Sequence, residues 1–86
     1  MSDEVIEELA ALEHDQWVAW SKEIAKTEPI SLRRLARWKK FWVPYAELPD
    51  DVKEFDRIWA RKVHEILTRE VEKEAQAVSD LYPYGE

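Results

Sequence analysis

The sequence predicts an all-α protein in which two long helices pack antiparallel and a short basic helix lies across them. Apolar residues recur with helical spacing in three segments, which is the main signal for helices. The chain has only one Gly, and it combines five Trp with a hydrophobic fraction of 45%. This composition is typical of a small globular helical protein. We therefore expect one helical domain over residues 1–81 and a flexible tail over residues 82–86.

The first predicted helix runs from Asp3 to about Lys26. The acidic residues of its first turns lie where the positive end of the helix dipole favours them. The segment Thr27-Glu28-Pro29 ends it, because the residue before a proline is biased away from the helical conformation. When residues are placed 100° apart, its apolar side chains form one broad stripe, which comprises Val5, Ile6, Leu9, Leu12, Trp17, Trp20 and Ile24.

The second predicted helix is short and basic. Ser31 is a good N-cap for it, and we expect it to run to about Trp42. Pro44 ends it, and residues 43–49 are expected to form an extended connector with a turn. Leu32, Leu35 and Trp42 lie on one side of this helix, and Arg33, Arg37 and Lys40 lie on the opposite side.

The third predicted helix opens at Pro49-Asp50-Asp51, where Asp51 and Glu54 have the spacing of a capping box. Its apolar face comprises Val52, Phe55, Trp59, Val63, Ile66 and Leu67, and continues more thinly through Val71, Ala75 and Val78.

The length of this third helix has a geometric consequence. From Asp51 to Val78 it would measure about 42 Å, whereas a compact chain of this length has a diameter of roughly 30 Å. Either its last turns fray or its apolar stripe packs on a second protomer. We predict a homo-oligomer, most simply a two-fold dimer.

Composition argues against several classes of protein. The chain has no Cys, its two histidines are His14 and His64, and its one Gly is Gly85. It therefore lacks thiolate or paired-histidine zinc ligands and a Gly-rich phosphate loop. We predict that the protein is not an enzyme and that it uses no metal and no cofactor.

Charge and hydropathy point to the cytoplasm. Charged residues make up 37% of the chain, and the acidic start Ser2-Asp3-Glu4 does not resemble a signal peptide. No apolar run approaches the roughly 20 residues that a membrane span needs. We therefore predict a cytoplasmic protein without membrane contact. The net charge of −6 opposes sequence-independent binding to duplex DNA, but it is compatible with a local basic patch.

Two carboxylates lie in the middle of apolar stripes. Glu13 does so on the first helix and Asp56 on the third, and an unpaired charge there would cost several kcal/mol. Each therefore needs a partner. The partner is either structural, such as Arg34, Arg57, His14 or a Trp indole, or a polar group of a bound ligand.

The aromatic residues divide by their place on the stripes. Trp20, Trp42 and Trp59 are central and are expected in the core, whereas Trp17 and Trp38 are off-centre and suited to line a pocket. Five basic residues lie between Arg33 and Lys40, beside Trp38. Such a cluster suits a nucleobase with its phosphates. The alternative is a solvated helix face that balances the acidic long helices.

Two stretches carry a resemblance to a known family. The first is His14-Asp15-Gln16-Trp17, and the second is the run Val43-Pro44-Tyr45-Ala46-Glu47-Leu48 with the following Lys53-Glu54-Phe55-Asp56-Arg57. Together they resemble the RyR domain, the small repeat named for ryanodine receptors and found also in prokaryotic and phage proteins. The chain has a predicted helix at 31–41 where that family has a Gly-Trp-x-Tyr-Gly hairpin.

This resemblance implies a ligand-recognition or protein-interaction module rather than a catalyst. Prokaryotic and phage members are thought of as sensors or binders of nucleotide-derived signals in conflict systems. For this chain, the resemblance suggests a viral or accessory protein, acting in the host cytoplasm if viral, that captures such a ligand.

We therefore predict a non-enzymatic binding module for a small anionic, nucleotide-derived ligand. The site is expected where the first helix, the second helix and the Pro44-Tyr45 connector meet. One alternative is a protein-interaction module that docks through the long third helix, and another is a small helical nucleic-acid binder. The predicted ligand-binding residues are His14, Trp17, Arg33, Arg37, Trp38, Lys40 and Tyr45.

Overall fold

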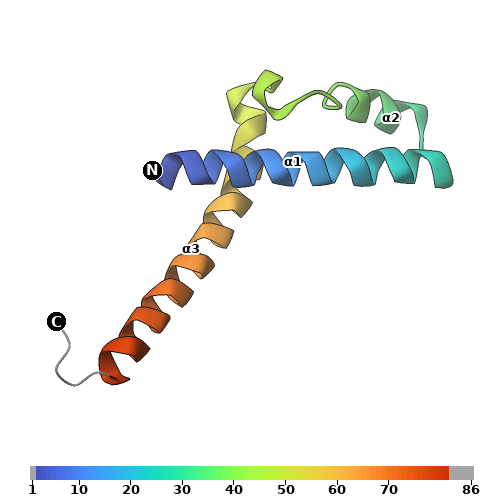
Figure 1. The fold of residues 1–86 in the computed structure, drawn as a ribbon. Coiled ribbons are helices and arrows are strands. Elements are labelled where there is room, and N and C mark those ends of the chain that lie inside the picture. The colour runs from blue at the N-terminus through green and yellow to red at the C-terminus, as the bar shows by residue number, and fades with distance from the viewer. Residues whose placement is uncertain (1, 82–86) are drawn as a thin grey trace.

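The protein is built from three α-helices and one short 3-10 turn (Figure 1). The computed structural model describes residues 2–81 and, within them, the side chains of residues 3–76. No strand occurs in this part of the chain, so the all-α prediction is confirmed. The tail predicted at 82–86 lies outside the described residues. The elements in order are α1 (Ser2–Thr27), α2 (Leu32–Lys39), η1 (Tyr45–Glu47) and α3 (Asp50–Leu81).

Helix α2 begins as predicted and ends earlier. Ser31 caps it, because its Oγ accepts a hydrogen bond from the Arg34 amide at 3.1 Å. The prediction that the helix runs to about Trp42 was wrong, since it ends at Lys39. The reason lies in two contacts with α1: the Trp42 indole donates to Ser21, and the Val43 carbonyl lies against His14. Both contacts require the chain to leave the helical path.

The start of α3 differs in detail from the prediction. The helix begins at Asp50, so Asp51 lies inside the first turn and not at its N-cap. The Asp51 carboxylate accepts a hydrogen bond from the Val52 amide at 3.0 Å. Glu54 is held instead by Arg61, whose guanidinium donates to it at 2.7 Å. The predicted capping box is therefore not formed.

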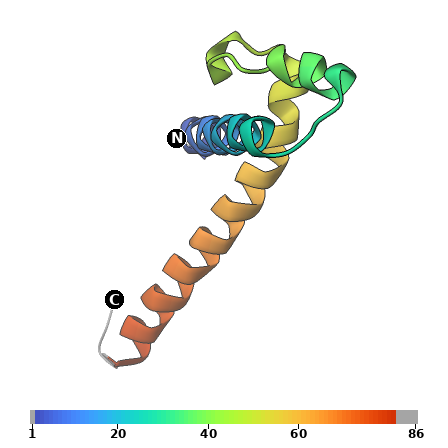
Figure 2. The ribbon, with the colours of Figure 1, turned by 90° about the vertical axis from the view of Figure 1, so that its right-hand side faces the viewer.

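The two long helices cross each other. Figures 1 and 2 show α3 passing α1 and then leading away from it toward the C-terminus. Ala10 of α1 and Ala60 of α3 belong to one buried cluster, and both are fully buried, because their small side chains let two helices approach closely. The antiparallel arrangement predicted from the sequence is not confirmed, since α3 leaves α1 after the crossing.

The buried core is small. Among the described side chains, the buried apolar ones are Ala10, Tyr45, Leu48 and Ala60. The radius of gyration is 19.0 Å, against about 12 Å for a compact chain of this length. The chain therefore leaves more apolar surface exposed than a globule of its size would.

This open shape overturns part of the predicted core. Trp20 is 54% exposed and Trp59 is 58% exposed, so placing them in the core was wrong for the single chain. Each lies on an apolar stripe that is wider than the surface packed against it. Trp42 is half-buried, and its Nε1 donates to Ser21 Oγ at 2.9 Å. Within the described residues, no helix is long and apolar enough to cross a membrane.

Candidate functional site

A pocket of about 270 Å³ opens between α1, the segment after α2 and the first turns of α3. Helical spacing explains which side chains reach it, since residues three or four apart share one face of a helix. On α1 these are His14 and Trp17, and on α3 they are Val52, Phe55 and Asp56. The full lining comprises His14, Trp17, Phe41, Val52, Phe55 and Asp56.

His14 is fixed at the back of this pocket. It is only 4% exposed, and its Nε2 lies 2.7 Å from the carbonyl oxygen of Val43. Because a carbonyl oxygen can only accept, His14 Nε2 carries the proton and donates it. The imidazole is also stacked against the Trp17 ring, with a centroid distance of 6.1 Å. The hydrogen bond thereby holds Val43, in the segment after α2, against the middle of α1.

Asp56 faces the other nitrogen of this imidazole. The distance from Asp56 Oδ2 to His14 Nδ1 is 3.9 Å, which is too long for a hydrogen bond but short enough for charge interaction. Burial raises the pKa of the Asp56 carboxyl, His14 opposes this shift, and the charge of Glu13 adds to it. Of the structural partners that the sequence analysis suggested for Asp56, His14 is the one that lies beside it. The Asp56 carboxylate also lines the pocket.

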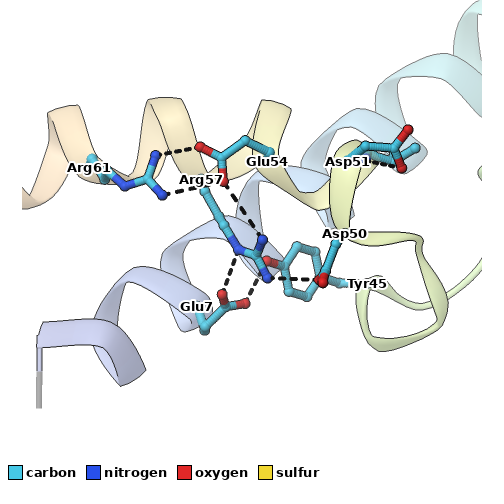
Figure 3. A network of polar contacts seen from close by, with 8 residues as sticks. Glu7, Tyr45, Asp50, Asp51, Glu54, Arg57 and Arg61 are labelled. Carbon is cyan, nitrogen blue, oxygen red and sulfur yellow. Dashed lines mark hydrogen bonds and ion pairs between the residues drawn. The ribbon is translucent and has the colours of Figure 1, made fainter.

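A polar network braces the pocket from the N-terminal side of α1 (Figure 3). The Tyr45 hydroxyl donates to Glu7 Oε2 at 2.6 Å, and Arg57 Nε donates to Glu7 Oε1 at 2.6 Å. Arg57 also pairs with Asp50 and Glu54, at 3.4 Å and 3.7 Å. Three separate elements, α1, η1 and the start of α3, are therefore joined at the Glu7 carboxylate, which accepts from both Tyr45 and Arg57.

Tyr45 acts in this network as a buried support. Burial and the hydrogen bond to Glu7 raise the pKa of Tyr45 to about 12, so its hydroxyl stays protonated. The ring lies 6.5 Å from the His14 ring, and the Lys53 ammonium lies 5.3 Å from its centre. Tyr45 therefore stands behind His14 and does not line the pocket.

Trp38 joins α2 to α1. Its ring lies 6.1 Å from Trp17 in an edge-on arrangement and 5.9 Å from Trp20. The guanidinium of Arg34 lies 6.0 Å from the centre of the Trp38 ring. Trp38 therefore lies on the face of α2 that is turned to α1, and it is a neighbour of the pocket rather than part of its lining.

The three cations predicted to bind phosphates lie on the surface. Arg33, Arg37 and Lys40 are all exposed, and none of them lines the pocket at His14. Packing explains this, because Trp38 turns its own face of α2 toward α1 and leaves the neighbouring face in solvent. The structure thus brings His14 and Trp17 together and leaves the three cations exposed outside the pocket lining.

The sequence-based prediction missed three pocket residues. Val52 and Phe55 carry no signal besides their apolar character, which was attributed to the stripe of the third helix, and Phe41 was not assigned to the site. Asp56 was singled out as a carboxylate that needs a partner, and this signal was the one that could have found the pocket. Among the described residues, no group of three or more His, Cys, Asp or Glu side chains is placed to hold a metal ion.

Comparisons with family models, curated proteins and solved structures find no match for this chain. The resemblance to the RyR domain therefore stays a prediction that rests on residues 14–17 and 43–57 alone.

Proposed function

We propose that this protein binds a small anionic molecule that contains a nucleobase, and that it releases this ligand unchanged. The observation that carries the proposal is the pocket at His14, which combines aromatic walls with one partly buried carboxylate. Its volume of about 270 Å³ lies just below the roughly 300–1,000 Å³ typical of drug-sized ligands. A base fits such a pocket, whereas the rest of a nucleotide would extend outside.

The base is held by stacking and by one polar contact. Trp17, Phe41 and Phe55 offer flat apolar surfaces, and stacking on such surfaces contributes about 1–3 kcal/mol for each base. Asp56 accepts a hydrogen bond from an amino or imino group of the base. This contact favours bases that present N–H donors, and it gives the carboxylate the ligand partner that its position in an apolar stripe calls for.

The phosphates point away from Asp56 because its charge repels them. Exposed positive charge is concentrated on and just after α2, at Arg33, Arg37 and Lys40. Arg binds a phosphate through two parallel hydrogen bonds, so the two arginines on one helix face suit this role. The ligand therefore lies with its base in the pocket and its charged part over α2.

This function agrees with the RyR-domain resemblance, which implies ligand recognition. It is favoured over nucleic-acid binding because the net charge of −6 opposes a long phosphate backbone. The alternative of a protein-interaction module is favoured by a separate observation, the exposed apolar side of α3.

The test measures the binding of a defined panel of ligands by titration calorimetry and by the shift in the thermal unfolding midpoint. The panel holds AMP, GMP, a cyclic dinucleotide and ADP-ribose, with ribose 5-phosphate as a base-free control. Binding stabilises the folded state in proportion to the logarithm of ligand concentration over its dissociation constant, so a specific ligand gives a saturable shift. The base-free control is expected to give none.

Two variants locate the site for the ligand so found. Trp17→Ala is expected to weaken binding by about 1–3 kcal/mol, and Arg37→Ala by about 1.5–3 kcal/mol. The matched controls are Trp20→Ala, which removes an exposed Trp outside the pocket, and Arg69→Ala, which removes an exposed Arg of α3. Unchanged affinity in both site variants would place the ligand elsewhere, and turnover of the ligand would show an enzyme.

A further inference from the structure

Helix α3 carries an apolar residue at every fourth position over most of its length. We call Phe55, Trp59, Val63, Leu67 and Val71 the α3 row. Val63 is half-buried, and the other four are between 54% and 71% exposed. Large contiguous apolar patches on a protein surface mark interaction sites. The described residues of this chain leave most of the row exposed, so we expect another molecule to pack against it.

We propose that the α3 row is the docking surface for a second copy of this chain in a two-fold dimer. Residues four apart form a ridge on a helix, and the ridges of two helices interdigitate at a crossing angle of about −50°, which is the commonest class of helix packing. A two-fold axis places the same surface of both copies together. The α3 row meets its own equivalent in this way, so one helix supplies both sides of the contact.

The surface area agrees with a partner of this size. The chain exposes 7167 Å², whereas a folded monomer of its mass exposes about 5,400 Å². Covering the excess of about 1,800 Å² on each of two chains would bury about 3,600 Å² in total, within the roughly 2,000–5,000 Å² of obligate homodimers. The exposed Leu12 and Trp20 of α1 offer further apolar area to such an interface.

The small core gives the reason for a second copy rather than another protein. Two alanines, Tyr45 and Leu48 are the buried apolar residues of the described part, which is little for 86 residues. A chain of this kind gains its remaining apolar burial only on association. The partner that is present whenever this chain is made is another copy of it, so folding and dimerisation are coupled.

The dimer does not depend on the proposed ligand. The two surfaces nevertheless meet at one residue, because Phe55 begins the α3 row and also lines the pocket at His14. In this proposal the second copy therefore docks next to the pocket.

The experiment measures mass and stability of the wild-type chain without ligand. Sedimentation equilibrium at micromolar concentration is expected to give twice the chain mass of 10.3 kDa. The thermal midpoint is expected to rise with protein concentration, because dissociation accompanies unfolding. A mass of one chain, together with a midpoint that does not change with concentration, would overturn the proposal and leave the α3 row to a different protein.

Two variants test whether the row itself is the interface. Trp59→Glu and Leu67→Glu each place a charge in the contact and are expected to weaken the dimer by about a hundredfold. Thr68→Glu adds the same charge at an exposed position of α3 outside the row and is expected to leave the dimer intact. A dimer that survives both row variants, or one that Thr68→Glu weakens equally, would overturn this interface. Should a row variant fail to fold at any concentration, the midpoint of the wild-type chain decides.

Discussion

The two halves of α3 differ sharply although they belong to one continuous helix. Its first half, from Asp50 to about His64, is tied to α1 and η1 by Arg57, Asp56 and the fully buried Ala60. Its second half projects away from the rest of the chain (Figure 2) and exposes Leu67 and Val71. The residue types of the two halves are similar, so helix formation alone does not distinguish them.

The difference shows what the chain can and cannot stabilise by itself. In the first half, Arg57 and Asp56 have partners on α1, namely Glu7 and His14. In the second half, the ion pair recorded among the described residues joins Lys73 to Glu70 on the same helix. The first half therefore belongs to the fold of one chain, and the second half depends on helix propensity and, in our proposal, on association with a second copy.

The largest difference between the halves is expected from a substitution that overpacks the crossing of α1 and α3. Ala60→Leu inserts a branched side chain at a fully buried position and should lower the free energy of unfolding by about 2–3 kcal/mol. Ala75→Leu makes the same change at an exposed position of the second half, where about 0.5 kcal/mol or less is expected. Urea unfolding at one fixed protein concentration measures both. Equal losses would contradict the division of α3.

Removing the central guanidinium of the network is the next largest effect. Arg57→Ala takes away the charged hydrogen bond to Glu7 and the pairs with Asp50 and Glu54. Since Glu7 and its neighbours are partly exposed, a loss of about 1.5 kcal/mol is expected, at the low end for hydrogen bonds to charged groups. Arg69→Ala in the second half should change the free energy of unfolding by less than about 0.5 kcal/mol. A larger effect of Arg69 would show that the second half is the better anchored one.

The sequence predicted the helices themselves better than the packing between them. Periodicity predicted three helices, with ends close to the observed ones except for the end of the second helix, because the helical repeat and the prolines are local signals. The arrangement of the two long helices was not predictable, since it depends on the close approach at Ala10 and Ala60, and alanine carries no signal for a crossing. Trp20 and Trp59 were placed in a core because a stripe shows that a side is apolar without showing what covers it.

The candidate site was predictable to a similar extent. His14 and Trp17 were found because they are three residues apart on one helix, and Asp56 was noted because a carboxylate interrupts an apolar stripe. Phe41 and Phe55 were missed because they come from segments that only the folded chain brings together. Arg33, Arg37 and Lys40 were predicted to bind phosphates because of their spacing, but none of them lines the pocket, and Trp38 is the residue of α2 that packs against Trp17 of α1.

Acid should affect the first half of α3 through Glu7. Hydrogen bonds from Tyr45 and Arg57 lower the pKa of Glu7, so its ionised form stabilises the folded state. This stabilisation is present above the ordinary glutamate pKa of 4.5 and is lost as pH falls below it, through the lower pKa of the folded chain. Glu7→Gln lacks this titration. Its urea midpoint should therefore fall less over this range than that of the wild-type chain, and parallel curves would contradict the role of Glu7.

The smallest expected effect has the opposite sign and concerns Asp56, at the point where the anchored half of α3 meets the pocket. Burial raises the pKa of Asp56, so its ionised form costs stability, and the wild-type chain loses stability as pH rises through that raised pKa. Asp56→Asn removes this cost and should raise the free energy of unfolding at neutral pH by less than about 1 kcal/mol. Asp15→Asn, at an exposed carboxylate of α1, is the control and should leave the free energy of unfolding unchanged.

Because Asn donates as well as accepts, the same Asp56 variant should also reduce the preference of the pocket for bases with N–H donors. A more stable variant with unchanged ligand preference would assign Asp56 to His14 alone, and a less stable variant would show that its charge interaction with His14 outweighs the cost of burial.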